Sequence, residues 1–268
     1  MDANLNSRVF TAALAVPLLV LLVGWSPSWL FAAVFFAVTV GALHEYFTMA
    51  FPNRSRDRGM GIAFGICLSA AIFLDDYVRS LVWLDMVVLV AFCVYLSSGG
   101  ELADRLNRLS ISMLGAIYAG YFLSHWVLLF RSSEGRAWVF WVLAVVMSGD
   151  TMAYFIGRRF GVRKLAPEIS PGKTLAGIWG YVIGAVIAGW LAALALFKST
   201  DWMEISLLSV ALSILGQMGD LFESWIKRVF GVKDSGNLLP GHGGLLDRLD
   251  SLIFPAVFTT AYLQAFHR

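Results

Sequence analysis

Seven carboxylates lie within or at the mouth of apolar segments of this 268-residue chain: Glu45, Asp85, Asp150, Asp220, Glu223, Asp247 and Asp250. Ionisable groups in such segments are costly to bury and are functional candidates by default. Asp220 and Glu223 are three residues apart, so a helix places them on one face, and Asp247 and Asp250 repeat this spacing. Carboxylates at one depth repel unless a cation lies among them, and oxygen ligands near phosphate favour Mg²⁺. The pattern predicts such a site, with pairing of each acid to a Lys or Arg of its own loop as the alternative.

A glycine-rich segment lies between these two pairs of acids. It contains Gly236, Gly241, Gly243 and Gly244. Glycines allow conformations closed to other residues, and successive exposed amides can cradle phosphate oxygens. His242, between two of the glycines, could donate to a phosphate or act as an acid or base.

A second polar segment, 158–174, ends in Gly172, Lys173 and Thr174. It is not a Walker A loop, because Pro167 stands where the first glycine of that motif is needed and no strand is expected before it. Lys173 at a helix entrance is nevertheless a good phosphate ligand, since helix N-terminal amides and a fixed cation both favour anions.

The composition of the chain indicates a membrane protein. Hydrophobic residues make up 59% and charged residues only 14%, whereas soluble domains carry roughly 25% charged residues. The net charge of +2 predicts no strong attraction to nucleic acid.

The apolar runs predict an all-α, polytopic fold, because a chain in lipid must satisfy its own backbone hydrogen bonds. A span needs about 20 residues. Nine candidate spans lie at about 8–25, 28–50, 59–75, 80–97, 110–130, 136–157, 174–198, 202–227 and 249–267. We expect an N-terminal part of five helices, 1–130, and a catalytic part of four helices, 131–268, with loops 158–173 and 228–248.

The charges of the loops predict the orientation. Fifteen Lys and Arg residues fall on the side of the N-terminus and of loops 158–173 and 228–248, against five on the other side. Because cytoplasmic loops carry the excess of positive charge, the N-terminus and both long loops are predicted to be cytoplasmic, and the C-terminus outside.

The segment from Ser224 to Asp250 resembles the signature of the phosphatidate cytidylyltransferase (CDP-diacylglycerol synthase) family along its whole length. The matching positions are Ser224, Lys227, Arg228, Lys233, Asp234, Gly236, Pro240, His242, Gly243, Gly244, Asp247, Arg248 and Asp250. Residues 149–161 and 169–174 are similar to the family's preceding blocks, with one departure at Ala176, where many members carry Glu.

The resemblance implies Mg²⁺-dependent transfer of CMP from CTP to phosphatidate in the bilayer, with release of pyrophosphate. It implies Asp220, Asp247, Asp150 and Glu223 as metal ligands, and K⁺ as a candidate second cation. The catalytic residues would be Asp220, Asp247, Asp250, Lys233 and His242. The substrate-binding residues would be Ser170, Lys173, Thr174, Ser224, Lys227, Arg228, Asp234, Gly243, Gly244 and Arg248. The expected setting is a prokaryotic inner membrane, with a cytoplasmic site and a homodimer as the candidate assembly.

Two other functions are weighed against this one. A related enzyme could use CTP on another lipid phosphate, such as an archaeal ether lipid, because the signature reports the nucleotide better than the lipid. A cation-coupled transporter would carry inverted repeats and polar residues near the bilayer midplane. The sequence has no evident repeat, and its acids gather at one membrane face.

Overall fold

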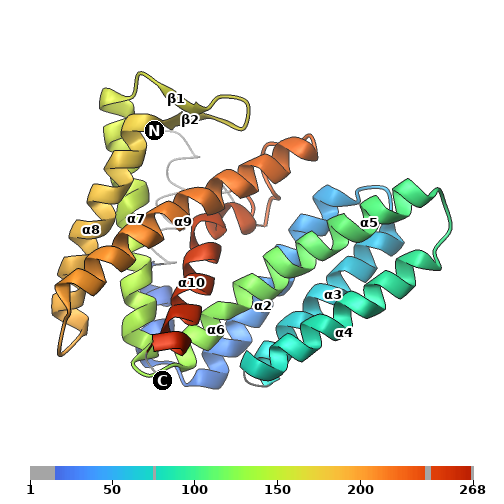
Figure 1. Ribbon diagram of the computed structural model, residues 1–268, viewed down its shortest axis with the longest axis horizontal. Helices are drawn as coiled ribbons and strands as arrows, with labels where there is room; N and C mark the ends of the chain where they lie inside the picture. Colours follow the sequence, from blue (N-terminus) through green and yellow to red (C-terminus); the bar gives the residue numbers. More distant parts are fainter. Residues whose placement is uncertain (1–15, 75–76, 239–242, 267–268) are drawn as a thin grey trace. The chain divides into compact units, whose positions relative to one another are not determined.

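The computed structural model describes residues 16–74, 77–238 and 243–266 and is almost entirely helical (Figure 1). Residues Val16–Trp25 are helical. The helices that follow are α2 (Ser28–Ala50), α3 (Ser55–Leu74), α4 (Tyr77–Leu96), α5 (Leu102–Gly115), the π-helix η1 (Ala116–Phe122), α6 (Leu123–Arg131), α7 (Gly135–Phe160), α8 (Leu175–Leu196), α9 (Trp202–Val229), the 3₁₀-helix η2 (Leu246–Arg248) and α10 (Asp250–Phe266). Two short strands, β1 (Lys164–Ala166) and β2 (Ser170–Thr174), lie between α7 and α8.

Six helices in the described part of the chain are long and apolar enough to cross a membrane. They are α2, α3, the continuous helix Leu102–Arg131, α7, α8 and α9. Val16–Trp25 and Leu81–Leu96 are shorter apolar helices, and α10 has 17 residues with Pro255 inside it. The predicted all-α membrane architecture is confirmed at this level, whereas the count of nine spans and the orientation of the termini stay predictions.

The chain forms two compact units. The first contains residues 1–131 and 234–247, and the second contains 132–233 and 248–268. Most of the loop 228–248 therefore belongs to the first unit, although its flanking helices α9 and α10 belong to the second. This assignment was not expected from the sequence, where the loop was grouped with the four C-terminal helices.

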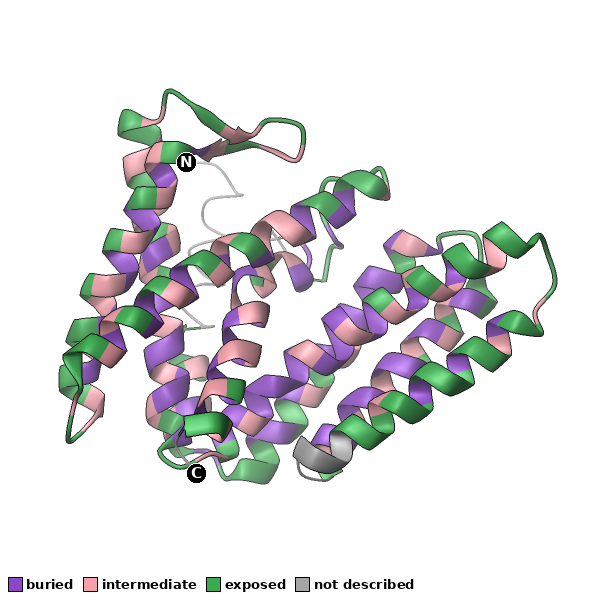
Figure 2. Cartoon of the chain, viewed as in Figure 1, coloured by how far each residue is buried: buried purple, intermediate pink, exposed green. Residues whose placement is uncertain are grey.

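The first unit packs α2 against α3 and the helix Leu102–Arg131. Its core is rich in aromatic side chains, including the stacked pair Phe31 and Phe130. Figure 2 shows that buried and exposed positions alternate along its helices. Close approach depends on glycine at Gly120, where an added Cβ would lie 2.9 Å from the carbonyl oxygen of Gly65. This contact falls within η1, where the helix is locally widened.

The second unit is organised by the long antiparallel pair α7 and α8 (Figure 1). Small residues allow these two helices to meet backbone to backbone. A Cβ on Gly180 would lie 2.8 Å from the carbonyl oxygen of Met152. The N-terminus of α10 packs against α9 in the same way, because a Cβ on Gly219 would lie 2.3 Å from the carbonyl oxygen of Asp250.

The strands β1 and β2 form a small antiparallel hairpin that the sequence did not predict. Lys164 pairs with Thr174, and Ala166 pairs with Ser170. The strands have only three and five residues, too few for an alternating hydrophobic pattern to be recognisable. The expectation that no strand precedes Gly172, Lys173 and Thr174 was therefore wrong. The rejection of a Walker A loop itself holds, because Gly172–Thr174 lie inside β2 and Pro167 replaces the first glycine.

Candidate active site

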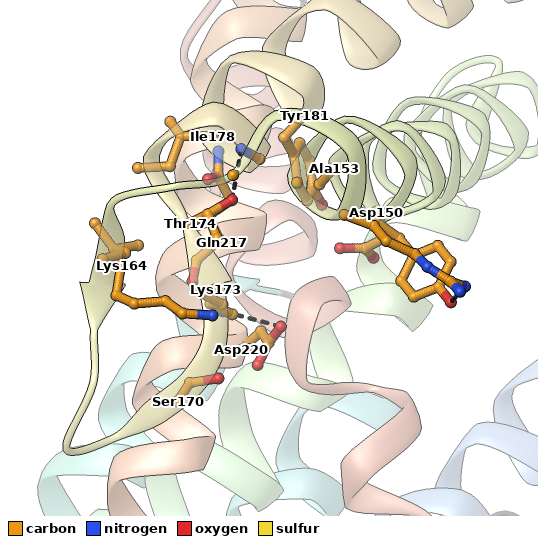
Figure 3. Close-up of a pocket in the computed structure, with 17 residues that line it drawn as sticks. Asp150, Ala153, Lys164, Ser170, Lys173, Thr174, Ile178, Tyr181, Gln217 and Asp220 are labelled. Atoms are coloured by element: carbon orange, nitrogen blue, oxygen red, sulfur yellow. Dashed lines mark hydrogen bonds and ion pairs between the residues drawn. The ribbon is translucent and has the colours of Figure 1, made fainter.

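A polar cavity of about 580 Å³ opens in the second unit between α7, the hairpin, α8 and α9 (Figure 3). It brings together five of the predicted site residues: Asp150, Ser170, Lys173, Thr174 and Asp220. They come from three different elements, α7, β2 and α9, so their proximity is a product of the fold. Both acidic and basic groups face this space.

The entrance of α8 forms one wall of the cavity. Thr174 is the N-cap of α8, and its hydroxyl accepts a hydrogen bond from the amide of Gly177 at 3.1 Å. Thr174 is buried, so this predicted substrate ligand has a structural role in starting the helix. The positive end of the helix dipole and the ammonium of Lys173 consequently meet at one place, which suits an anion.

Lys173 and Asp220 form an ion pair across the cavity, shown as a dashed line in Figure 3. Their Nζ and Oδ2 atoms are 2.9 Å apart, and both side chains remain partly exposed to the cavity. The hydroxyl of Ser224, one turn further along α9, donates to Oδ1 of Asp220 at 3.4 Å. The alternative that the sequence left open, pairing with a Lys or Arg of the same loop, is not what is seen at Asp220, because its partner Lys173 comes from the other polar loop.

Asp150 and Asp250 lie near this pair. The hydroxyl of Ser251 in the first turn of α10 donates to Oδ2 of Asp150 on α7 at 3.0 Å. Asp220 interacts electrostatically with both Asp150 and Asp250. The sequence predicts that Asp250 lies near Asp220, because the two pairs of acids have the same three-residue spacing at one membrane depth. The close contact of α10 with α9 at Gly219 allows the two carboxylates to approach.

Three predicted residues at the end of α9 are held by protein partners. Glu223 is fully buried and forms an ion pair with Lys227 one turn later. Arg228 donates to the carbonyl oxygen of Ile169 at the hairpin turn, 3.3 Å from its Nε, and to that of Val232, 2.9 Å from its Nη1. Arg228 therefore connects the hairpin to the end of α9.

Asp247 belongs to the first unit, where it organises the glycine-rich loop. Its Oδ2 accepts hydrogen bonds from the amides of Ser235 and Gly244, at 3.0 and 2.9 Å. Gly243 has a φ of +79°, a conformation that favours glycine. Because Asp220 belongs to the second unit, joint binding of a metal by Asp220 and Asp247 stays a prediction.

The other predicted residues of this loop contribute surface charge or fall outside the description. Lys233, Asp234 and Arg248 are exposed. His242, proposed as a phosphate donor or acid/base group, lies outside the described residues.

The donor set is compatible with Mg²⁺ bound together with a substrate. Across residues 16–74, 77–238 and 243–266, no three or more His, Cys, Asp and Glu side chains are arranged to hold a metal ion by themselves. Mg²⁺ commonly uses only one or two carboxylates, with substrate phosphates and water as its other ligands. Asp150 and Asp220, which line the same cavity, supply carboxylate oxygens of this kind.

Several lining residues were missed by the sequence analysis. They are Lys164, Arg158, Tyr181 and Gln217. Gln217 precedes Asp220 by three residues and thus shares its helix face, a signal that could have identified it. Tyr181 reads as an ordinary aromatic of an apolar helix, and only the α7–α8 packing brings it to the cavity.

Comparison with known proteins identifies the family of this chain. Residues 6–266 match the model of the cytidylyltransferase family. The chain is 36% identical over 257 residues to a phosphatidate cytidylyltransferase of Brucella abortus, covering 95% of this chain and 91% of that one. It is 40% identical over 154 residues to a phosphatidate cytidylyltransferase of Bacillus subtilis, which is 57% of each chain. An uncharacterised Escherichia coli protein is 34% identical over 235 residues, or 86% of this chain and 78% of that protein.

The apolar helices and the family match together define the general class as a membrane transferase. Within this class, the chain belongs to the cytidylyltransferase family.

Proposed function

We propose that this protein transfers CMP from CTP to phosphatidate, giving CDP-diacylglycerol and pyrophosphate in phospholipid biosynthesis. The single observation that carries the proposal is the cavity in which Lys173, the N-terminus of α8, Asp150 and Asp220 meet. The names of the Brucella and Bacillus relatives supply the substrate.

In the proposed reaction, a phosphate oxygen of phosphatidate attacks the α-phosphorus of CTP. A new P–O bond forms, and the bond from the α-phosphorus to the oxygen bridging to the β-phosphate breaks, with that electron pair leaving on pyrophosphate. The nucleophile is already an anion, so no strong base is needed. Such transfers are catalysed mainly by positioning and by electrostatic stabilisation.

The basic groups at the hairpin and α8 are suited to holding a triphosphate. Lys173 would exchange its contact with Asp220 for phosphate oxygens, and the positive end of the α8 dipole would add to the anion site. Lys164, on the neighbouring strand, also lines the cavity and adds positive charge.

The acidic groups would hold Mg²⁺. In the proposal Asp220 and Asp150 are its ligands from the cavity, Asp247 is added from the signature, and Glu223 from its spacing to Asp220. When bound, the ion would neutralise phosphate charge. Asp250 is a further carboxylate near Asp220, and a bound cation would relieve the repulsion between them; K⁺ is the candidate for a second cation.

The proposal includes the membrane setting. Six apolar helices and bacterial relatives support an inner-membrane protein. The positive charge of loops 158–173 and 228–248 supports a site that faces the cytoplasm. Assembly as a homodimer is retained as a proposal that chemical cross-linking in detergent would test.

The deciding experiment supplies the purified protein with Mg²⁺, labelled CTP and a panel of lipid phosphates. We expect labelled CDP-diacylglycerol from phosphatidate, with release of one pyrophosphate per product. A product formed only from an ether-linked lipid phosphate would favour the alternative acceptor, and the absence of any CDP-lipid would overturn the proposal.

A further inference from the structure

Glu45 is a buried carboxylate on α2 that contacts the glycine-rich loop of the first unit. Glu45 is only 3% exposed, yet its carboxylate accepts hydrogen bonds from several donors. Oε1 accepts the amide of Leu245 at 2.9 Å, and Oε2 accepts the amide of Leu246 at 2.9 Å and the hydroxyl of Ser235 at 3.1 Å. Two consecutive backbone amides and one hydroxyl therefore enclose this carboxylate.

The loop is shaped to fit this carboxylate. A Cβ on Gly236 would lie 2.6 Å from Oε1 of Glu45, and one on Gly244 would lie 2.7 Å from Oε2. Real side chains do not approach so closely, so both glycines are needed for the loop to close around Glu45. Since the loop is separated from α2 by about 190 residues of sequence, these contacts are a tertiary feature.

Ser235 connects Glu45 to Asp247. Its hydroxyl donates to Glu45 and accepts the amide of Asp247 at 3.3 Å. Its own amide donates to Oδ2 of Asp247, which also accepts the amide of Gly244. The Asp247 carboxylate is thus oriented by the amides of Ser235 and Gly244, which belong to or adjoin the residues whose hydroxyl and amides bind Glu45.

We propose that Glu45 is a positioning residue that holds residues 234–238 and 243–247 of this loop, and with them Asp247, in the geometry required for nucleotidyl transfer. The expected effect of Glu45 on turnover rests on the proposed function, whereas its effect on the loop does not. It gives a role to one of the first helices, where the sequence has no resemblance to a catalytic motif.

The Glu45→Gln variant tests this role, because a carboxylate has two acceptor oxygens and a carboxamide has only one. Gln has the same length, but one of its two terminal atoms becomes a donor. In either orientation that NH₂ group faces a backbone amide, of Leu245 or of Leu246, and one hydrogen bond is replaced by a repulsive contact. Glu45→Asp keeps both acceptors and the charge but is one methylene shorter, so we expect an intermediate effect.

Hydrogen exchange measured by mass spectrometry on the full-length protein in detergent reads the loop directly. We expect Glu45→Gln to raise the exchange rate of the amides of Leu245 and Leu246 at least tenfold, with a similar thermal unfolding temperature. Thr39→Val is the matched control, because Thr39 is also buried on α2 but bonds only to Phe35 of its own helix. This control should leave exchange in the loop unchanged.

Kinetics provide the second readout. Glu45→Gln should lower kcat at least tenfold while changing the KM for CTP less than threefold, because the residues that line the cavity all belong to the other unit. Glu45→Asp should recover part of kcat. A merely structural role would reduce the amount of folded enzyme and leave kcat per folded molecule unchanged.

Ser235→Ala offers a milder variant if Glu45→Gln does not fold. It should accelerate exchange at Asp247, and the double variant should be no worse than the more damaging single change, since both act through one network. Wild-type exchange rates in Glu45→Gln or Ser235→Ala would overturn the proposal. If the wild-type protein makes no CDP-lipid, the proposed function fails, while the exchange experiment still tests the loop.

Discussion

At the scale of single residues, the cavity brings together charged side chains, each of which would be costly to bury without a partner. Lys173 neutralises Asp220, and Ser251 donates to Asp150. These partners offset the free-energy cost of burial, because a buried or half-buried carboxylate needs hydrogen-bond donors or a cation. A substrate that brings phosphates and a metal ion can replace these internal partners, which is how a resting ion pair becomes a binding site.

Lys173→Met should raise the KM for CTP by about 10- to 100-fold, since a hydrogen bond to a charged group contributes about 1.5–3 kcal/mol. Steady-state kinetics against CTP concentration would measure this. Lys198→Met is the control, as Lys198 follows the other end of α8. An unchanged KM would remove Lys173 from the nucleotide site.

Asp220→Asn should lower kcat about 100-fold or more, as is typical when a preorganised charge at a reacting phosphate is lost. Activity should be measured over a range of Mg²⁺ concentrations, with folding monitored by size-exclusion chromatography. Asp201→Asn is the control, because Asp201 caps α9 at its far end and Asn is an equally good cap. Near wild-type activity of Asp220→Asn would contradict its role as a metal ligand.

At the scale of elements, the site depends on two helix pairs that meet through glycine. Gly180 lets α7 and α8 approach, and Gly219 lets α10 lie against α9. Membrane helices associate through such packing, because lipid gives them no hydrophobic drive toward each other. The hairpin then adds Lys173 and Ser170 at the entrance of α8.

Gly180→Ala should destabilise the protein by about 1–3 kcal/mol, because the added methyl has backbone rather than a flexible side chain in its way. Gly59→Ala on α3, where nothing lies within 4 Å of the new Cβ, is the matched control. It should be neutral or slightly stabilising, since Ala favours helix by about 0.5–1 kcal/mol over Gly. Unfolding of both variants in detergent by denaturant would compare them, and equal stabilities would contradict the packing role of Gly180.

At the scale of the whole molecule, the remaining question is which face of the membrane the two polar loops occupy. The positive-inside asymmetry predicts the cytoplasm for both. Cys67 and Cys93 are free and exposed, so a labelling experiment needs both replaced first.

In that background, cysteines at Ser55 and Asn237 should react with a membrane-impermeant thiol reagent only in inverted vesicles. A cysteine at Ser199, in the connection between α8 and α9, should react only in right-side-out vesicles. Labelling of position 55 or 237 from the outside would overturn the predicted orientation.

The helices could be predicted well from sequence, and the hairpin could not. Apolar runs such as 28–50 coincide with helices because a backbone in lipid has few alternatives. The hairpin 164–174 is short and charged, and its pairing depends on local hydrogen bonds. In the candidate site, Lys173, Asp150 and Asp220 were found from charge placed at a helix end or in an apolar segment. Tyr181 could not be found, because its side chain has no such signal.

The sequence by itself determined the membrane class, the two polar loops and the phosphate-handling residue types, since these follow from composition, local spacing and the resemblance. Only the tertiary structure decided that Lys173 pairs with Asp220, and that Glu45 of α2 holds residues 234–238 and 243–247. Both contacts join residues far apart in the chain. Their existence depends on helix packing, which no periodicity in the sequence encodes.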